Sequence, residues 1–458
     1  MVRRRAFVYT IGIAISVAAI VAALELGEIR FASGVPTLTV AEPGNLQHIA
    51  HARGPLAILI VQLLVIILAT QLLGSVSGLV RQPAVIGEIA AGLLLGPSLL
   101  GYLWPAGYAA LFPAASLDVL RLLSQIGVIL FMFSVGLDLD VQHLRQRAPT
   151  AIAVSHFSIV VPFLLGVLLA IALYRSYAPG GVPFRAFGLF MGIALSITAF
   201  PVLARVLDER GLTRTPLGST AIACAAVDDV TAWSLLAVVV TLVTAGGVGR
   251  TLASMVIALG VVLAVMVWIV RPLLATMLGS GTATLSRTRT ALTLVVMLAS
   301  ALTTEALGIH ALFGAFLAGV IMPQSAELRR QLRERLESLS SVFLLPIFFA
   351  FTGLRTQIGL LNDAWSWIVC AGIVLTAIAG KLVGSMLAAR WTGSSWRDAF
   401  ILGTLMNTRG LMELIALNVG YDLGILSPRM FTMLVVMALV TTAMTGPLLD
   451  AVWRPRSR

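Results

Sequence analysis

The sequence is short of charge. Of its 458 residues only 11% are Asp, Glu, Lys or Arg, whereas 59% are apolar. Soluble domains carry about 25% charged residues, so this chain cannot cover a water-exposed surface while burying so much apolar area. The shortage excludes a soluble enzyme, and it argues against a nucleic-acid-binding protein despite a formal net charge of +11. We expect an all-helical protein that crosses a lipid bilayer many times.

Cysteine and aromatic residues are also scarce. Cys224 and Cys370 are the only cysteines, and both lie in apolar runs. Two such thiols cannot build a disulfide framework, which excludes a disulfide-stapled secreted domain, and we interpret both as small buried side chains. Aromatic residues make up 7% of the chain, fewer than a cavity for an organic solute would use. We expect no cofactor and no enzymatic activity.

Apolar runs dominate what is present. A run of about 20 residues crosses a bilayer core of about 30 Å, and thirteen or fourteen transmembrane helices are expected. The runs cover residues 6–25, 55–76, 82–103, 119–137, 150–174, 185–207, 216–244, 251–270, 289–305, 309–323, 341–359, 365–389, 397–420 and 429–453. The first follows three consecutive Arg residues and is interpreted as a retained helix rather than a signal peptide.

The distribution of Arg residues predicts the orientation. If every run spans the bilayer, most Arg residues fall in loops on the side of the N-terminus, which is then cytoplasmic. Both termini are expected in the cytoplasm of a bacterium, with the protein in its cytoplasmic membrane. Residues 324–340 predict a short amphipathic helix at the inner surface. The tail 454–458 is too short for a tethered nucleotide-binding domain, so none is expected.

Short motifs recur in the two halves of the chain. Ala-Gly precedes a Pro at Ala91-Gly92 and again at Ala318-Gly319, and a Phe precedes Gly-Leu near Gly136 and again near Gly353. The pattern predicts two six-helix repeats, 55–244 and 289–453. One crossing within the linker 245–288 separates them, so the second repeat is inverted, as in many secondary transporters. Residues 1–54 precede the first repeat as an N-terminal helix and an outer loop.

The fifth run of each repeat is interrupted by residues unsuited to a membrane helix. Pro201 follows Thr198-Ala199-Phe200 in the first, and Asn407-Thr408-Arg409-Gly410 interrupts the second. A simple proline kink is the alternative at Pro201. Two breaks at matching positions predict crossed half-helices that offer free backbone groups to an ion. Arg409 and Glu413 lie four residues apart on one face, which predicts an internal ion pair that stabilises the break.

Asp228 and Asp229 stand at the centre of an apolar run. A charge at this depth costs about 2.5–3.5 kcal/mol on insertion scales, so the pair needs partners. Neighbouring helical residues point about 100° apart. One carboxylate can therefore meet an ion while the other meets a counter-charge; a purely structural polar pair is the alternative. Carboxylate oxygens suit hard cations, and no zinc-type metal site is expected.

Lys381 is the only lysine among 31 basic residues, and it too lies inside an apolar run. Arg stays charged, whereas a buried Lys can give up its proton. A titratable amine at this single position indicates that the function of the protein is coupled to proton transfer. A lysine that extends its amine to the membrane surface is the alternative.

These residues together resemble the monovalent cation/proton antiporter-2 family of the sodium/hydrogen exchanger superfamily, which includes Kef-type and plant cation/proton exchangers. The matching motifs are Gly87-Glu88-Ile89 through Gly96-Pro97, Thr198-Ala199-Phe200-Pro201 through Arg205, Asp228-Asp229, Gly314 through Gly319, and Asn407-Thr408-Arg409-Gly410 with Glu413. The resemblance runs from about residue 55 to 450. It implies a homodimer in which a mobile core domain moves as an elevator. Kef-type members also carry a C-terminal nucleotide-binding domain, and this sequence departs from them there.

The resemblance also implies roles for single residues. Asp229 would bind the cation and the proton, and Asp228 would be its companion. Lys381 would pair with Asp228 and exchange a proton, and Thr198 would supply oxygen atoms at the crossing. We therefore expect exchange of Na⁺ or K⁺ for protons, electrogenic if Lys381 also carries a proton. A regulated cation channel or sensor, and a proton-coupled transporter of an organic solute, are the alternatives.

Overall fold

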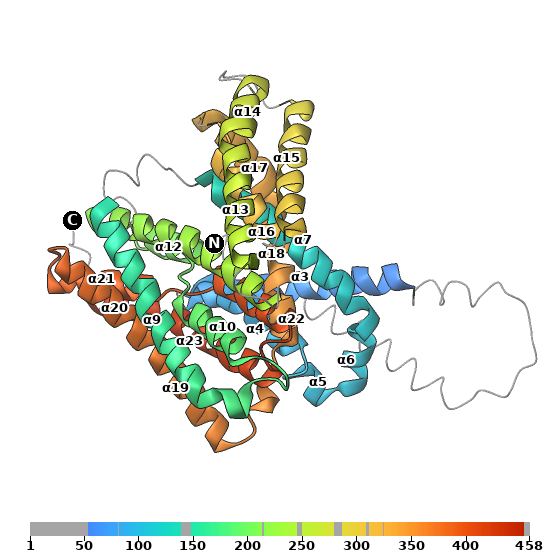
Figure 1. Ribbon diagram of the computed structural model, residues 1–458. Helices are drawn as coiled ribbons and strands as arrows, with labels where there is room; N and C mark the ends of the chain where they lie inside the picture. Colours follow the sequence, from blue (N-terminus) through green and yellow to red (C-terminus); the bar gives the residue numbers. More distant parts are fainter. Residues whose placement is uncertain are drawn as a thin grey trace, which may run out of the picture.

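The computed structural model describes residues 54–80, 82–138, 148–212, 215–244, 250–278, 286–307, 311–323 and 325–452. Within these ranges the chain is almost entirely helical (Figure 1), which confirms the predicted all-helical fold. Nine of the described helical runs are long and apolar enough to cross a membrane, and α10 and α16 are shorter apolar helices. The predicted N-terminal helix 6–25 and the tail 454–458 lie outside the described residues.

The helices follow the apolar runs closely. The first half contains α3 (Pro55–Leu79), α4 (Ala84–Leu95), α5 (Leu100–Leu103), α6 (Pro105–Leu111), α7 (Ala114–Asp138), α9 (Ala148–Tyr177), α10 (Phe184–Ser196), α11 (Phe200–Glu209) and α12 (Pro216–Thr244). A helical connection of α13 (Arg250–Val265), η1 (Met266–Val270) and α14 (Arg271–Leu278) follows. The second half contains α15 (Arg287–Ala306), α16 (Ala311–Ile321), α17 (Ala326–Leu339), η2 (Ser340–Leu344), α18 (Leu345–Arg355), η3 (Ile358–Leu360), α19 (Ala364–Ile378), η4 (Ala379–Val383), α20 (Gly384–Trp391), α21 (Trp396–Met406), α22 (Leu411–Asp422) and α23 (Pro428–Val452).

The helices pack as two groups. Helices α9 to α12 pack with α19 to α23, and we call this group the core bundle. Helices α3, α4, α7 and α15 to α18 pack with one another, and we call them the scaffold bundle. In the described part of the chain, the closest backbone approaches between the bundles lie where α18 meets α22 and where α4 and η3 meet α23, and buried apolar side chains of both bundles form one continuous cluster.

The glycines of the recurring motifs bring scaffold helices close together. A Cβ atom on Gly136 of α7 would lie 2.2 Å from the carbonyl oxygen of Phe316, and one on Gly319 of α16 would lie 2.2 Å from that of Phe133. Gly92 of α4 and Gly353 of α18 face each other's helices in the same way. Small residues at such positions let membrane helices approach until their backbones touch. The motifs therefore mark two helix pairs, α7 with α16 and α4 with α18.

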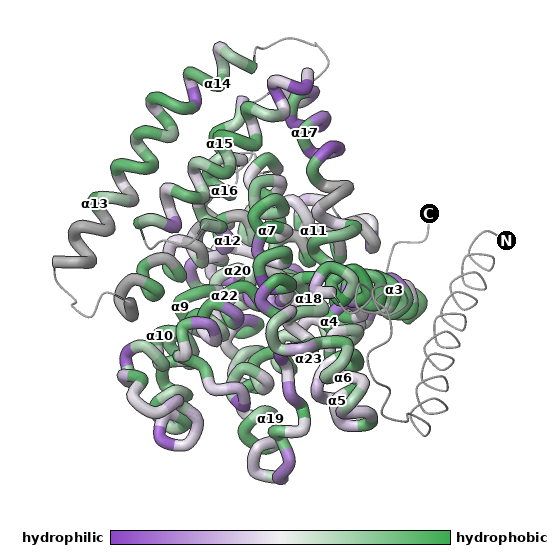
Figure 2. Tube along the Cα trace, turned by 90° about the vertical axis from the view of Figure 1, so that its right-hand side faces the viewer, coloured by the Kyte–Doolittle hydropathy of each residue, from purple (hydrophilic) through white to green (hydrophobic). Residues whose placement is uncertain are grey.

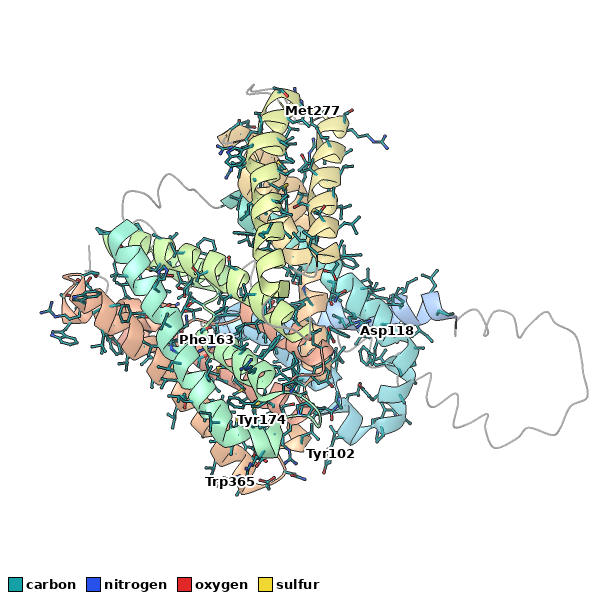
Figure 3. The ribbon with its side chains drawn as sticks, in the orientation of Figure 1. Tyr102, Asp118, Phe163, Tyr174, Met277 and Trp365 are labelled. Atoms are coloured by element: carbon teal, nitrogen blue, oxygen red, sulfur yellow. The ribbon has the colours of Figure 1, made fainter. Side chains whose placement is uncertain are left out.

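The two ends of the molecule differ in character. Helix α17 is strongly polar and lies at the same end of the molecule as α14 (Figure 2). Its Arg329 donates to the carbonyl oxygens of Leu137, Met322 and Pro323, at the ends of α7 and α16. Exposed Tyr102 and Trp365 lie at the opposite end from Met277 (Figure 3), as expected for aromatic side chains at a membrane interface. The predicted helix 324–340 thus exists as α17, and its place at the inner surface stays a prediction.

Candidate functional site

Both interrupted helices are broken inside the core bundle. Helix α10 ends at Ser196 and α11 begins at Phe200, while α21 ends at Met406 and α22 begins at Leu411. Pro201 is the second residue of α11, where its missing N–H leaves no helical hydrogen bond unmade. The breaks touch: the amide of Ala199 donates to the carbonyl oxygen of Thr408 at 2.9 Å. Four half-helix ends therefore meet within the bundle.

Arg409 supplies hydrogen-bond donors to the C-terminal end of α10. Its guanidinium donates to the carbonyl oxygens of Ala194 at 2.7 Å and Leu195 at 2.6 Å, in the last turn of α10. These carbonyls have no partner within their own helix. Glu413 lies 3.3 Å from the same guanidinium, and both side chains are fully buried. The charge pair that the spacing predicted is thus present, and it supports the first break as well as the second.

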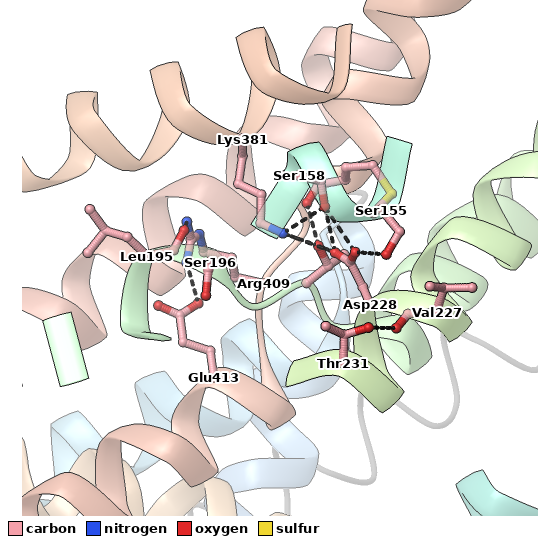
Figure 4. A network of polar contacts seen from close by, with 12 residues as sticks. Ser155, Ser158, Leu195, Ser196, Val227, Asp228, Thr231, Lys381, Arg409 and Glu413 are labelled. Atoms are coloured by element: carbon pink, nitrogen blue, oxygen red, sulfur yellow. Dashed lines mark hydrogen bonds and ion pairs between the residues drawn. The ribbon is translucent and has the colours of Figure 1, made fainter. Parts of the chain in front are cut away.

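Asp228 sits at the centre of a polar network (Figure 4). One carboxylate oxygen accepts from Ser155 at 2.6 Å, and the other accepts from Ser158 at 2.7 Å and from Thr198 at 2.6 Å. The Lys381 amine lies 3.1 Å from the second oxygen, and both charged side chains are fully buried. Residues of α9, the first break, α12 and η4 thus converge on one carboxylate.

Lys381 reaches this carboxylate from an irregular turn. It lies in η4, a π-helical turn between α19 and α20, and such turns occur often at functional sites. Its amine donates to Thr198 at 2.5 Å as well as to Asp228. The amine therefore points into the bundle, and its complete burial excludes the alternative of a lysine reaching the membrane surface.

Asp229 has a different environment. It is 1% exposed, and among the described residues neither of its carboxylate oxygens has a hydrogen-bond partner. A buried carboxylate without a partner is unfavourable unless it takes up a proton or a cation. Both carboxylate oxygens of Asp228 thus have hydrogen-bond partners, whereas those of Asp229 have none in the described structure.

Sequence reasoning missed several polar groups of this site. Ser155 and Ser158 lie three residues apart, a helical spacing that would have placed them on one face. Asn407, at the end of α21, is 1% exposed, and neither atom of its amide has a partner in the described structure. It lies between Met406, whose carbonyl oxygen is 3.0 Å from the Thr198 hydroxyl oxygen, and Thr408, whose carbonyl oxygen accepts from the Ala199 amide. The position of Asn407 within the interrupted run was the sequence feature that could have identified it as a site residue.

Comparison with known proteins agrees with this geometry. Residues 61–454 match the family described as sodium/hydrogen exchanger, transmembrane. The chain is 44% identical over 403 residues to the Na(+)/H(+) antiporter NhaS4 of Synechocystis, a match that covers 87% of this chain and 98% of that one. It is 33% identical over 419 residues to the K(+)/H(+) antiporter 1 of Saccharomyces cerevisiae, covering 88% of this chain but only 47% of the yeast protein.

A solved structure supports the fold. The sodium proton antiporter MjNhaP1 of Methanocaldococcus jannaschii superimposes with a TM-score of 0.56 at 14% identity, covering 87% of this chain and 97% of that one. The family match and the 44% identical relative confirm the predicted family, and the protein is a transporter rather than an enzyme. The chain belongs to the sodium/hydrogen exchanger family of multi-pass membrane proteins that exchange a cation for protons.

Proposed function

We propose that Asp229 is the shared binding site for the transported cation and the proton. The observation that carries this proposal is the contrast between two adjacent buried carboxylates. Asp228 accepts from three hydroxyl groups and a lysine, whereas no described residue donates a hydrogen bond to Asp229. A proton or a monovalent cation satisfies Asp229, but both cannot occupy it at once. This competition couples the two fluxes.

The crossing supplies further ligands for a cation. Backbone and amide oxygens, together with a carboxylate, suit hard cations. We propose Thr198 and the Asn407 amide as neutral ligands beside Asp229. The ion pair of Arg409 and Glu413 has a structural role in this account, because its guanidinium already binds the end of α10.

Alternating access is proposed to occur by an elevator movement of the core bundle against the scaffold bundle. The support is the packing: the site lies wholly within the core bundle, and the backbones of the two bundles approach closely at few places in the described residues. Such a movement would carry the crossing intact from one side of the membrane to the other. We further propose that the protein works as a homodimer in a bacterial cytoplasmic membrane, with both termini inside.

The identity of the cation and the coupling are tested in proteoliposomes. With an imposed pH gradient and a pH-sensitive dye inside, Na⁺, Li⁺ and K⁺ are added in turn. One of these cations is expected to collapse the gradient in the wild type but not in Asp229→Asn. Absence of collapse by any cation, with folded protein, contradicts exchange and favours a channel, a sensor or an organic-solute transporter.

Electrogenic exchange is proposed through Lys381. If the amine gives up its proton when the cation binds, two protons move per cation and one net charge crosses the membrane. Each net charge is worth about 2.3 kcal/mol per 100 mV, so an imposed membrane potential should change the wild-type rate. We expect Lys381→Arg, which cannot release a proton, to lose this voltage dependence. Equal activity of Lys381→Arg and wild type at every pH contradicts the role.

A further inference from the structure

Arg355 joins the two bundles at the ends of their helices. It is the last residue of α18 in the scaffold bundle, and its guanidinium donates to the amide oxygen of Asn418 at 2.8 Å. It also pairs with Asp422, the last residue of α22 in the core bundle. The guanidinium carbon lies 4.5 Å from the centre of the Tyr421 ring, also on α22. One side chain thus holds α22 by three contacts.

These contacts are polar, whereas buried apolar side chains of both bundles form one continuous cluster. The ion pair of Arg355 with Asp422 joins the two bundles, whereas those of Asp228 with Lys381 and of Arg409 with Glu413 lie within the core bundle. The amide of Asn418 adds a hydrogen bond to Thr352 of α18 at 3.0 Å. We call Arg355, Asn418, Tyr421 and Asp422 the clasp.

A cavity of about 380 Å³ lies beside the clasp, between the bundles. Arg121 and Gln125 of α7 and Glu305 of α15 line its scaffold side, while Ile415 and Val419 of α22 line its core side. Arg355, Asn418 and Asp422 belong to its wall. Ile415 lies in the second turn of α22, the half-helix that starts at the second break. The cavity therefore extends from the clasp toward the crossing.

We propose that Arg355 is a positioning residue for transport, which closes the mouth of this cavity by tying α22 to α18. The inference rests on the proposed movement of the core bundle, because α22 cannot move away from α18 while the clasp holds. The clasp must open and close in each cycle. Its strength then sets how often the route between this side of the membrane and the crossing is open.

The chemistry of the clasp suits a reversible contact. A planar guanidinium can bind two acceptors and stack on an aromatic ring together, which a lysine amine cannot do. The side chains of Arg355 and Asp422 are 17% and 25% exposed. Water can therefore replace their mutual contact when the bundles separate, unlike the buried contacts of Arg409. The clasp holds a closed state without making it permanent.

Labelling of a cavity thiol tests the proposal. Ile415→Cys is placed in a background of Cys224→Ala and Cys370→Ala, and a water-soluble maleimide is added to protein in lipid nanodiscs. Loss of the charge-assisted hydrogen bonds in Arg355→Gln is expected to speed labelling about tenfold. Arg355→Lys, which keeps the charge but not the forked contact, should fall between the parent and Arg355→Gln.

Arg121→Gln is the matched control. It removes a positive charge from the same cavity, but in the described structure the Arg121 side chain pairs with Asp118 of its own helix, 3.4 Å away. Its labelling rate should equal that of the parent. A rate in Arg355→Gln that is equal to or slower than the rate in Arg121→Gln overturns the clasp.

Transport kinetics supply the second readout. We expect Arg355→Gln to change the KM for the cation, because the open state is populated more often, while Arg121→Gln leaves KM unchanged. A purely structural loss would lower the kcat without speeding the labelling, and that result also overturns the proposal. Labelling needs no transport. Absence of exchange by the wild type would contradict the proposed function and still leave the labelling rates to decide the role of Arg355.

Discussion

Asp228 and Asp229 are adjacent residues of α12, but their side chains lie in opposite environments. Asp228 is surrounded by donors from three other segments, and Asp229 has no hydrogen-bond partner among the described residues. The helical turn of about 100° per residue separates the two carboxylates. The lysine that compensates Asp228 therefore leaves Asp229 available. The residue pattern predicted such a division of partners, and the family resemblance, rather than the pattern, implied that Asp228 would pair with Lys381 and that Asp229 would be the free one.

The buried contacts of Arg409 lead to a prediction about the stability of the protein. In Arg409→Gln the last carbonyls of α10 lose their charged donor, and Glu413 is left buried without a counter-charge. Breaking a buried pair in this way costs about 3–5 kcal/mol, so the variant should unfold at a much lower temperature in detergent. The double variant Arg409→Gln with Glu413→Gln has no lone carboxylate and should recover part of the loss. A double variant less stable than the single one would contradict this reading.

At the scale of elements, the breaks and their capping are the decisive features. The apolar runs predicted nearly every described helix, because a chain in lipid must bond its own backbone and helices do so within one segment. Pro201 and Asn407 to Gly410 indicated where two runs would be interrupted. The sequence did not indicate that Arg409 would bind α10, a helix more than 200 residues away. Such long-range pairing depends on how the bundle packs.

The close contact between α7 and α16 leads to a prediction about the effect of replacing a glycine there on stability. In Gly136→Ala the new methyl group would meet the carbonyl oxygen of Phe316, and neither backbone can move without separating α7 from α16. Overpacking of this kind costs about 1–3 kcal/mol or more. Gly372→Ala of α19 is the control, because nothing lies within 4 Å of the added atom and Ala favours a helix. Thermal unfolding in detergent should separate the two variants; equal unfolding temperatures would refute the importance of the α7–α16 contact.

For the whole molecule, the division into two bundles matters most. Composition predicted a polytopic membrane protein, and recurring motifs predicted repeats. The structure adds that the motif glycines serve the scaffold bundle, while the charged residues of the site belong to the core bundle. No single sequence pattern shows which helices from distant parts of the chain share a bundle, because that depends on contacts across the membrane plane. For the same reason, the sequence could not predict which residues of α22 contact Arg355.

Proton release on cation binding tests the central claim most directly. Purified protein in unbuffered detergent solution is mixed with the cation that collapses the pH gradient, and a pH dye reports free protons. If proton and cation compete for Asp229, the wild type should release protons in proportion to the bound cation, and less of them at high pH, where the site is already deprotonated. Asp229→Asn should release none. Cation binding without proton release by the wild type, or unchanged release by Asp229→Asn, would contradict the shared site.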